Sequence, residues 1–305
     1  MSLSTKIGNL NIDTCIYNAA GVRSTNKKDL LELSRSEAGI VLTKSCTKIF
    51  NEGNSNPKYY YKDDTSLNSI GISNWGYEYY LNLGKQINNK KPYFISVNAS
   101  NIDECLFIVK NINNSNNVKG IELNVSCPNI INGSQIAYDF EKMEELVKKI
   151  KTEIRLKKVL GLKLPTYLDN SHFDKVAEII NKYNLDFITC INCIGKGMII
   201  DDETTVIVPN YGIGGLGGCI KPIALANVSS FFNRVECTII GCGGIKNGRD
   251  AFEHILAGAS AVQIGTQLYE NGPSFIGKVK EELLEIMKEK NYNKIEDFRG
   301  RPKFI

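Results

Sequence analysis

The segment Asn124-Val-Ser-Cys127-Pro-Asn129 places a thiol between two amide side chains and directly before a proline. A cysteine in such a loop, just beyond a strand, is held outside the core, and its thiolate can remove a proton from carbon. A free thiol titrates near pH ~8.5, so a neighbouring lysine would favour the ionised form. The chain has nine cysteines, and burial in the core is the alternative for this one. The flanking asparagines favour a catalytic role for Cys127.

Two lysines, Lys44 and Lys163, each stand at the end of an apolar stretch. An ammonium group turned toward a protein interior is costly without an anionic partner. A ligand phosphate, a reduced flavin or a substrate carboxylate would provide that partner. Schiff-base chemistry on a carbonyl substrate is the competing use of either lysine.

Small residues follow two further apolar stretches, as Gly243-Gly244 and as Gly265-Thr266. Backbone N–H groups that carry no bulky side chain can converge on an anion, so these turns predict a phosphate site. Ordinary tight turns are the alternative. The phosphate could belong to flavin mononucleotide (FMN) or to a sugar phosphate.

The stretch Gly212-Ile-Gly-Gly-Leu-Gly-Gly218 matches the letters of a dinucleotide-binding fingerprint. Pro209 and Asn210 interrupt the strand that should precede such a motif, and no early βαβ unit surrounds it. The stretch therefore indicates a loop that is mobile or that covers a ligand.

Cys190 and Cys193 form a C-x-x-C pair, but strand residues three positions apart point to opposite faces. We therefore expect neither a redox pair nor a metal site. His172 and His254 lie in helix-like segments and are predicted to be surface or packing residues.

The elements that must position these groups are eight short apolar runs that alternate with amphipathic helical stretches. Continuous apolar strands are typical of parallel sheets that are buried on both faces. Eight such units predict an α/β fold, a closed (β/α)₈ barrel that forms a single domain over residues 1–305. The predicted strands are Ile16–Gly21, Gly39–Ser45, Tyr93–Asn98, Gly120–Ser126, Val159–Leu164, Phe187–Asn192, Thr238–Gly243 and Ala261–Gly265. The predicted helices are Lys27–Ser34, Asn101–Ile112, Phe140–Lys151, Phe173–Tyr183, Ile223–Phe232, Gly248–Leu256 and Pro273–Lys288.

The barrel explains why the chemical groups should meet, because sites in such folds lie at the C-terminal ends of the strands. The lysines, Cys127 and the glycine turns all stand at those ends. Lys6–Ile12 predicts an N-terminal hairpin against the barrel floor. Residues 195–222 predict an excursion over the C-terminal face.

The composition is that of an ordinary globular protein, with 42% hydrophobic and 23% charged residues. The net charge of +4 comes with lysines spread over helix-like segments, which indicates solvated helix faces and not a nucleic-acid-binding surface. No apolar stretch is typical of a signal peptide or a membrane span. Cysteines inside apolar runs predict free thiols in a reducing compartment, and hence a cytoplasmic protein.

Taken in order, the motifs resemble those of the class 1A dihydroorotate dehydrogenases, the fumarate-linked type, over essentially the whole chain. The resemblance implies a homodimeric FMN enzyme that oxidises dihydroorotate to orotate in pyrimidine biosynthesis and passes the electrons to fumarate. It implies no iron–sulfur partner subunit. The matching stretches are Asn18–Val22, Thr43–Ser45, Asn68–Asn74, Glu122–Asn129, Ala137–Phe140, Gly161–Pro165, Ile191–Gly195, Gly214–Gly218 with Lys221-Pro222, Gly241–Ile245, Asp250–His254 and Gln263–Thr266.

The resemblance also implies a role for each site residue. Cys127 would be the base that removes a proton from carbon 5 of dihydroorotate, with the charge of Lys44 in the same catalytic site. Asparagine amides suit the planar pyrimidine because they both donate and accept hydrogen bonds. The implied substrate-binding residues are Lys44, Asn68, Ile70, Gly71, Ile72, Asn124, Asn129, Asn192 and Cys193. The implied FMN-binding residues are Ala20, Lys44, Ser45, Asn124, Lys163, Ile191, Gly218, Gly243, Gly244, Gly265 and Thr266.

Five positions depart from the family pattern. Ala20 and Cys193 stand where serine is usual, Asn51 and Lys58 stand where arginine is usual, and Asn98 replaces a small residue. A thiol donates a weaker hydrogen bond than a hydroxyl, and a loop without its arginines would close less firmly over an anionic substrate. These changes would affect substrate affinity and the choice of electron acceptor more than the core chemistry. A pyrimidine reductase of the dihydrouracil type and a catalytically impaired flavin-binding barrel are the alternatives.

Overall fold

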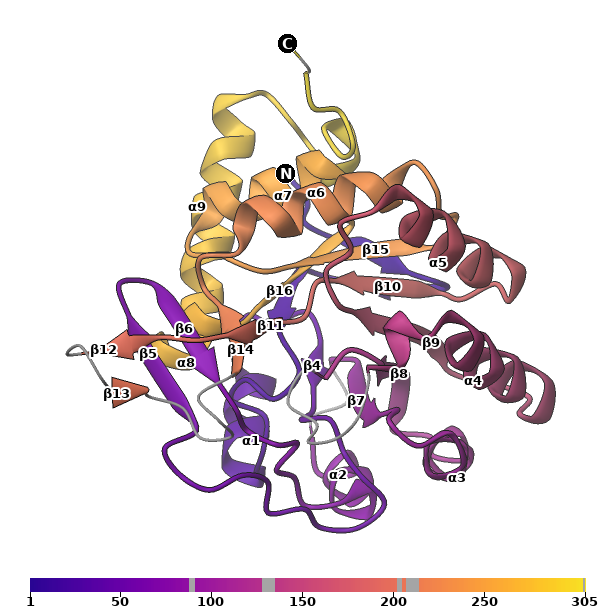
Figure 1. The fold of residues 1–305 in the computed structure, drawn as a ribbon. Coiled ribbons are helices and arrows are strands. Elements are labelled where there is room, and N and C mark those ends of the chain that lie inside the picture. Colours follow the sequence, from indigo (N-terminus) through magenta and orange to yellow (C-terminus); the bar gives the residue numbers. More distant parts are fainter. Residues whose placement is uncertain (88–90, 128–134, 202–204, 207–213, 304) are drawn as a thin grey trace.

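The computed structural model describes residues 1–87, 91–127, 135–201, 205–206, 214–303 and 305, and the fold is shown in Figure 1. Eight parallel strands form one curved sheet in the order β3-β16-β15-β10-β9-β8-β7-β4. The predicted (β/α)₈ barrel is confirmed, because each predicted apolar run overlaps one of these strands. Their bounds are β3 Ile16–Asn18, β4 Val41–Leu42, β7 Tyr93–Asn98, β8 Val118–Asn124, β9 Val159–Leu164, β10 Phe187–Cys190, β15 Thr238–Cys242 and β16 Ala261–Ile264.

The first and last strands of this order, β3 and β4, are joined by an asparagine side chain. Asn18 donates from Nδ2 to the carbonyl of Leu42 at 2.7 Å and accepts from the Leu42 N–H at 3.1 Å. The Gly39 N–H also donates to the Ile16 carbonyl at 2.9 Å. The amide thus takes the place of a backbone pairing and closes the barrel.

Large and small residues interlock inside the barrel. The rings of Phe94 on β7 and Phe187 on β10 face each other with centroids 6.0 Å apart, although two strands separate them in the sheet. A Cβ at Gly120 would lie 2.5 Å from the Phe94 ring, and one at Gly161 would lie 2.4 Å from the Phe187 ring. The intervening strands therefore carry glycine where the two rings fill the interior.

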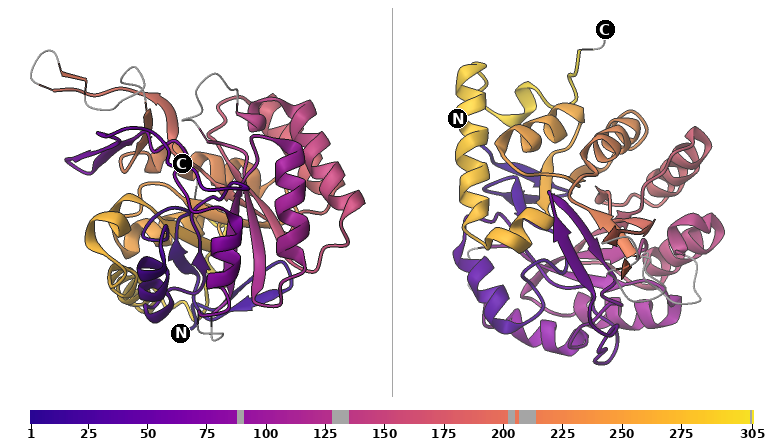
Figure 2. Two further views of the ribbon diagram at one scale, coloured as in Figure 1. Left: turned by 90° about the horizontal axis from the view of Figure 1, so that it is seen from below. Right: turned by 60° about the vertical axis from the view of Figure 1, so that its left-hand side comes forward.

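Helices surround the sheet on the outside, as the two views of Figure 2 make plain. Several begin at an Asn or Asp whose side chain accepts a backbone N–H of the first turn, namely Asn26, Asn101, Asp139, Asp169 and Asn247. The helices are α1 Lys27–Arg35, α2 Tyr77–Leu83, α3 Ile102–Asn113, α4 Phe140–Glu153, α5 Asn170–Lys182, α6 Lys221–Phe232, α7 Gly248–Ala257, α8 Thr266–Asn271 and α9 Phe275–Glu289, with short 3₁₀ turns at Ile136–Tyr138 and Ile295–Asp297. Two of them, α2 and α8, are not among the helices predicted from the sequence. Both are short, with seven and six residues.

The N-terminal hairpin is formed by β1 Thr5–Ile7 and β2 Leu10–Ile12, as the sequence predicts. Its turn residue Gly8 packs against Asp186 and Val159, which stand at the N-terminal ends of β10 and β9. The hairpin therefore lies at the floor of the barrel, at the end opposite to the strand ends that carry the polar residues.

A second sheet, the cover sheet, lies over the other end of the barrel. It is antiparallel, in the order β11-β14-β6-β5. The excursion predicted for residues 195–222 supplies part of it. Its strands are β5 Tyr59–Lys62, β6 Thr65–Asn68, β11 Ile194–Gly197 and β14 Gly214–Gly217, and a small hairpin of β12 Ile200–Asp201 and β13 Thr205–Val206 extends beyond it (Figure 2, left).

Within the described part of the chain, no helix is both long and apolar enough to cross a membrane.

Candidate active site

A cavity lies between the C-terminal ends of the barrel strands and the cover sheet. It opens to solvent and is lined by residues of both the barrel and the cover sheet. Asn129 lies outside the described residues, and every other predicted site residue lines this cavity. These residues are Ala20, Lys44, Ser45, Asn68, Ile70, Gly71, Ile72, Asn124, Cys127, Lys163, Ile191, Asn192, Cys193, Gly218, Gly243, Gly244, Gly265 and Thr266.

Cys127 and Lys44 belong to one electrostatic group in this cavity. Cys127 follows β8 and is only 8% exposed. Burial lowers the pKa of Lys44, while the nearby sulfurs of Cys127 and Cys193 act in the opposite direction, and the charge of Lys58 lowers it further. No carboxylate among the described residues lies within ion-pair distance of Lys44. The cavity therefore presents an ammonium group that favours a thiolate or an anionic ligand.

Gly21 makes room for this lysine. Its backbone has a φ of +82°, and a Cβ there would lie 2.7 Å from Cδ and 2.8 Å from Nζ of Lys44. A side chain at position 21 would therefore displace the ammonium group from the cavity wall.

A row of amide side chains runs along the cavity. Asn192 donates to Ser126 Oγ at 3.0 Å and to Asn124 Oδ1 at 3.3 Å, and Asn124 donates to Ser45 Oγ at 3.2 Å. On the cover sheet, Asn68 donates to the carbonyl of Gly215 at 3.1 Å. These contacts fix the planes of the amides before a ligand binds.

The turn at residues 70–72 has an unusual backbone. Gly71 and Ile72 have φ values of +69° and +57°, and the latter is rare for a β-branched residue. A Cβ at Gly71 would lie 2.5 Å from Oδ1 of Asn54. Asn51 also donates to the Gly71 carbonyl at 3.3 Å. Strained turns of this kind cluster at ligand sites, where surrounding contacts hold them in place.

The glycines that follow β15 and β16 form a narrow cradle. Gly244 has a φ of +69°, and a Cβ there would lie 2.6 Å from the Lys221 backbone nitrogen. A Cβ at Gly265, in contrast, would meet nothing within 4 Å. The backbone at Gly265 is therefore bare toward the cavity, as an anion cradle requires.

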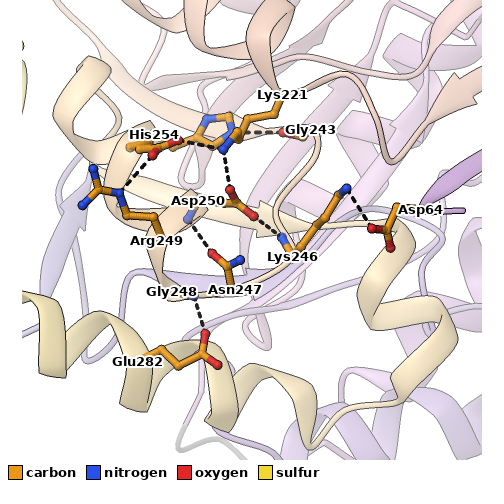
Figure 3. A network of polar contacts seen from close by, with 11 residues as sticks. Asp64, Lys221, Gly243, Lys246, Asn247, Gly248, Arg249, Asp250, His254 and Glu282 are labelled. Carbon is orange, nitrogen blue, oxygen red and sulfur yellow. Dashed lines mark hydrogen bonds and ion pairs between the residues drawn. The ribbon is translucent and has the colours of Figure 1, made fainter.

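Asp250 and His254 of α7 form hydrogen bonds with the residues next to this cradle. Asp250 accepts from the Lys246 N–H at 2.8 Å and from Lys221 Nζ at 2.6 Å, and His254 Nε2 lies 3.0 Å from the Gly243 carbonyl (Figure 3). His254 is fully buried, so of the two roles predicted for it the packing role is the one observed. Burial lowers its pKa to about 4.

Sequence reasoning missed two residues of the cavity region, Glu122 and Gln263. Both are completely buried, and both stand inside strands that the sequence presents as apolar runs. A carboxylate and an amide within a buried strand are themselves a signal, because such groups require partners. In the folded barrel the two side chains contact each other.

The other sequence patterns also have a place in the structure. Cys190 is buried in β10, whereas Cys193 lines the cavity, so the two thiols do not share a face. Gly214–Gly217 forms strand β14 of the cover sheet and not a phosphate turn, and Gly212 lies outside the described residues. No group of three or more His, Cys, Asp or Glu in the described ranges is arranged so that it could hold a metal ion.

Two of the five positions that depart from the implied family pattern line the cavity, and the other three do not. Ala20 and Cys193 line it directly. Asn51 reaches the turn at residues 70–72 through the contact with Gly71. Asn98 is buried and accepts from the Ser100 hydroxyl at 2.8 Å.

The structure is a (β/α)₈ barrel with a thiol, a lysine and a bare glycine cradle at one end, and in enzymes of this fold the loops after the last two strands frequently form a phosphate site. The chain belongs to the dihydroorotate dehydrogenase family, whose profile it matches over residues 2–287.

Proteins of known sequence and structure agree with this assignment. A Streptococcus agalactiae protein named "Putative dihydroorotate dehydrogenase A (fumarate)" is 47% identical over 311 residues, which cover all of both chains. The Streptococcus uberis protein of the same name is 46% identical and covers 100% of this chain and 99% of its own. The crystal structure of an Eimeria tenella dihydroorotate dehydrogenase in complex with ferulenol superposes with a TM-score of 0.83 at 20% identity, over 98% of this chain and 89% of that one. Because the identity is only 20%, this last comparison shows the fold alone.

Proposed function

We propose that this protein oxidises dihydroorotate to orotate, with FMN as the cofactor and Cys127 as the base. The observation that carries the proposal is the meeting of Cys127, Lys44 and a row of amides in one cavity beside a bare glycine cradle. Family membership supports the same conclusion.

The residues present fit FMN in two respects. The cradle at Gly243, Gly244 and Gly265 suits its phosphate, because a Cβ at Gly265 would point into open space and a neighbouring α7 carboxylate fixes the loop. Lys163 is 5% exposed and lines the cavity, so it would supply a positive charge beside the flavin ring. The remaining contacts with the flavin ring would come from Ser45, Asn124 and Ile191. The other proposed FMN-binding residues are Ala20, Lys44, Gly218 and Thr266. When bound, FMN would supply the acceptor for the hydride that leaves carbon 6 of dihydroorotate.

The substrate would lie between the amide row and the cover sheet. Asn68, Asn124 and Asn192 can match the donors and acceptors of its imide edge, and Cys193 stands beside them. Asn129 is proposed for the same edge by resemblance alone. The N–H groups of Ile70, Gly71 and Ile72, together with Lys44, would receive the substrate carboxylate.

The proton at carbon 5 would pass to the sulfur of Cys127. Lys44 favours the thiolate before this step because its ammonium charge lies close to the sulfur. Cys127 is only 8% exposed, so bulk water has little access to the thiolate. Cys127 would thus act as the general base.

Anaerobic mixing with dihydroorotate tests the proposal. The purified, FMN-loaded protein should lose its visible flavin absorbance, and orotate should form in equal amount. A protein that keeps its absorbance with dihydroorotate but loses it with dihydrouracil would instead be a pyrimidine reductase of the other type, for which Lys44 would have no carboxylate to bind. Loss of absorbance with neither substrate would contradict both functions.

We further propose fumarate as the electron acceptor, on the basis of the names of the streptococcal relatives. Reduced protein should regain its flavin absorbance when fumarate is added without oxygen. Recovery with a quinone or NAD, but not with fumarate, would contradict this proposal.

Resemblance also supports a homodimer of single-domain subunits, and the nine free cysteines fit the cytoplasm as its compartment. Light scattering should then give about twice the chain mass of 33.9 kDa. A monomeric mass would contradict the dimer.

A further inference from the structure

A chain of buried polar side chains crosses the barrel interior at the base of the cavity, which two of its members, Lys163 and Glu122, line. Lys163 on β9 donates from Nζ to Gln263 Oε1 on β16 at 2.6 Å. Gln263 donates from Nε2 to Glu122 Oε2 on β8 at 2.6 Å. Thr189 and Tyr17 complete the group, the first by donating to the same carboxylate oxygen at 2.8 Å and the second by accepting from Gln263 at 3.3 Å. Five strands thus contribute one residue each.

The two charges determine which way the Gln263 amide faces. Its oxygen must meet the ammonium group and its nitrogen must meet the carboxylate, because the reverse arrangement would place N–H against N–H and oxygen against oxygen. The amide therefore couples Lys163 to Glu122 without a direct ion pair between them. A lysine ammonium has three N–H donors, and this arrangement uses one for Gln263, a residue that does not line the cavity.

The carboxylate compensates the lysine in a place that water does not reach. Lys163 is 5% exposed, and Glu122 and Gln263 are both 0% exposed. Burial alone lowers the pKa of Lys163, but the charges of Cys242 and Glu122 more than offset this effect and the net pKa is raised. Lys163 therefore stays protonated in the folded protein across the neutral pH range.

We propose that Gln263 and Glu122 are positioning residues that hold the Lys163 ammonium against the cavity and thereby favour the reduced form of the bound flavin. The inference rests on the proposed binding of FMN. By its own negative charge the buried Glu122 carboxylate would disfavour an electron-rich, reduced flavin. We infer that it has the opposite effect, because it orients the Lys163 ammonium toward the flavin.

The two possible effects of Glu122 shift the flavin midpoint potential in opposite directions, so the inference can be tested. If Glu122 acted on the flavin only as a negative charge, its neutral replacement Glu122→Gln would raise the flavin midpoint potential. If it acts through Lys163, the same replacement lowers the potential. Gln263→Met removes the coupling without any change of charge, so a simple field effect predicts no shift for that variant.

The experiment measures the midpoint potential of the FMN-loaded protein by equilibration with reference dyes at neutral pH. We expect both variants to bind reduced FMN at least about tenfold more weakly relative to oxidised FMN, which is a potential about 30 mV lower for a two-electron couple. Lys163→Met provides the reference for complete loss of the ammonium group. Asp186→Asn is the matched control, because Asp186 is also a carboxylate that accepts a buried N–H, at the floor of the barrel.

Circular dichroism and the dissociation constant of oxidised FMN establish that each variant folds and binds the cofactor. A higher potential in Glu122→Gln, or an unchanged potential in Gln263→Met, would overturn the inference. The measurement needs no dihydroorotate. A protein that fails to oxidise dihydroorotate but shows the expected shifts would refute the proposed substrate and leave this inference standing.

Discussion

The amide nitrogen of Asn68 lies 3.4 Å from the sulfur of Cys193, where the cover sheet meets the loop that follows β10. This contact joins the roof of the cavity to the barrel. A thiol is a poor acceptor and a poor donor compared with a hydroxyl, so the contact is weaker than it would be with serine at position 193.

Cys193→Ser should therefore lower the KM for dihydroorotate about fivefold and leave kcat nearly unchanged, which corresponds to the ~1 kcal/mol of one better hydrogen bond. Steady-state kinetics check this expectation. Cys237→Ser, at the floor of the barrel, is the matched control and should leave KM unaltered. An unchanged KM in Cys193→Ser would show that the sulfur does not take part in substrate binding.

Removal of the proposed base should affect chemistry and not folding. Cys127→Ala should slow the anaerobic loss of flavin absorbance with dihydroorotate by about 10²- to 10⁴-fold, the usual contribution of a positioned base. Stopped-flow spectroscopy gives the rate, and titration gives the FMN affinity, which should stay within about twofold. Cys219→Ala, at an exposed cysteine, should react at the normal rate. A normal rate in Cys127→Ala would rule out the thiol as the base.

Two glycine replacements should affect different properties, one the binding of FMN and the other the stability of the fold. A Cβ at Gly265 would meet no protein atom, whereas one at Gly218, where φ is +74°, would lie 1.9 Å from the Asp64 carbonyl oxygen. Gly265→Ala should unfold like the parent but bind FMN about tenfold more weakly, because the new methyl group enters the cradle. Gly218→Ala should lose at least about 1–3 kcal/mol of unfolding free energy. Chemical denaturation of the apoprotein and FMN titration separate the two effects, and equal FMN affinity in Gly265→Ala would argue against the cradle.

The Asn18 contact between β3 and β4 should be essential for stability. Asn18→Leu leaves the N–H and the C=O of Leu42 buried without their partners, and each such group costs about 1–3 kcal/mol. We expect the unfolding free energy to fall by about 2–5 kcal/mol in urea denaturation. Asn111→Leu, on the outer part of α3, should change it by less than about 0.5 kcal/mol. A similarly small change in Asn18→Leu would mean that the barrel closes without this amide.

The buried histidine of α7 should make stability fall in mild acid. The pKa of His254 drops from 6.5 to about 4 on folding, because burial disfavours its charged form. Below pH 6.5 protonation favours the unfolded chain, so the contribution of His254 is lost as pH falls from 6.5 to 4, by about 3 kcal/mol in total. Urea denaturation at several pH values should show a smaller loss in His254→Gln over this window. The same pH dependence in both proteins would show that other groups account for it.

Much of the barrel could be predicted because its strands are continuous apolar runs and its sites must lie at their ends. That rule, applied to the amino-acid sequence, is enough to bring Lys44, Asn124, Lys163 and Gly265 together, and all four line one cavity. Their roles in catalysis and binding remain predictions, since they depend on ligands.

Pairings between distant segments could not be predicted in the same way. Nothing local in Thr65–Asn68 indicates that it pairs with Gly214–Gly217 in the cover sheet, because strand partners are chosen by tertiary packing. The Asn18 contact with Leu42 and the coupling of Lys163 to Glu122 through Gln263 have the same origin. Each depends on side chains from strands that are remote in sequence and that meet only when the sheet curves.

The cover sheet has a consequence for biosynthesis. Asn68 on β6 reaches the carbonyl of Gly215 on β14, 147 residues later in the chain, and the glycine cradle ends at residue 265. On a translating ribosome the roof of the cavity cannot form before β14 has emerged, nor the cradle before the eighth barrel strand. The proposed flavin site therefore cannot be complete until residue 265 has been synthesised.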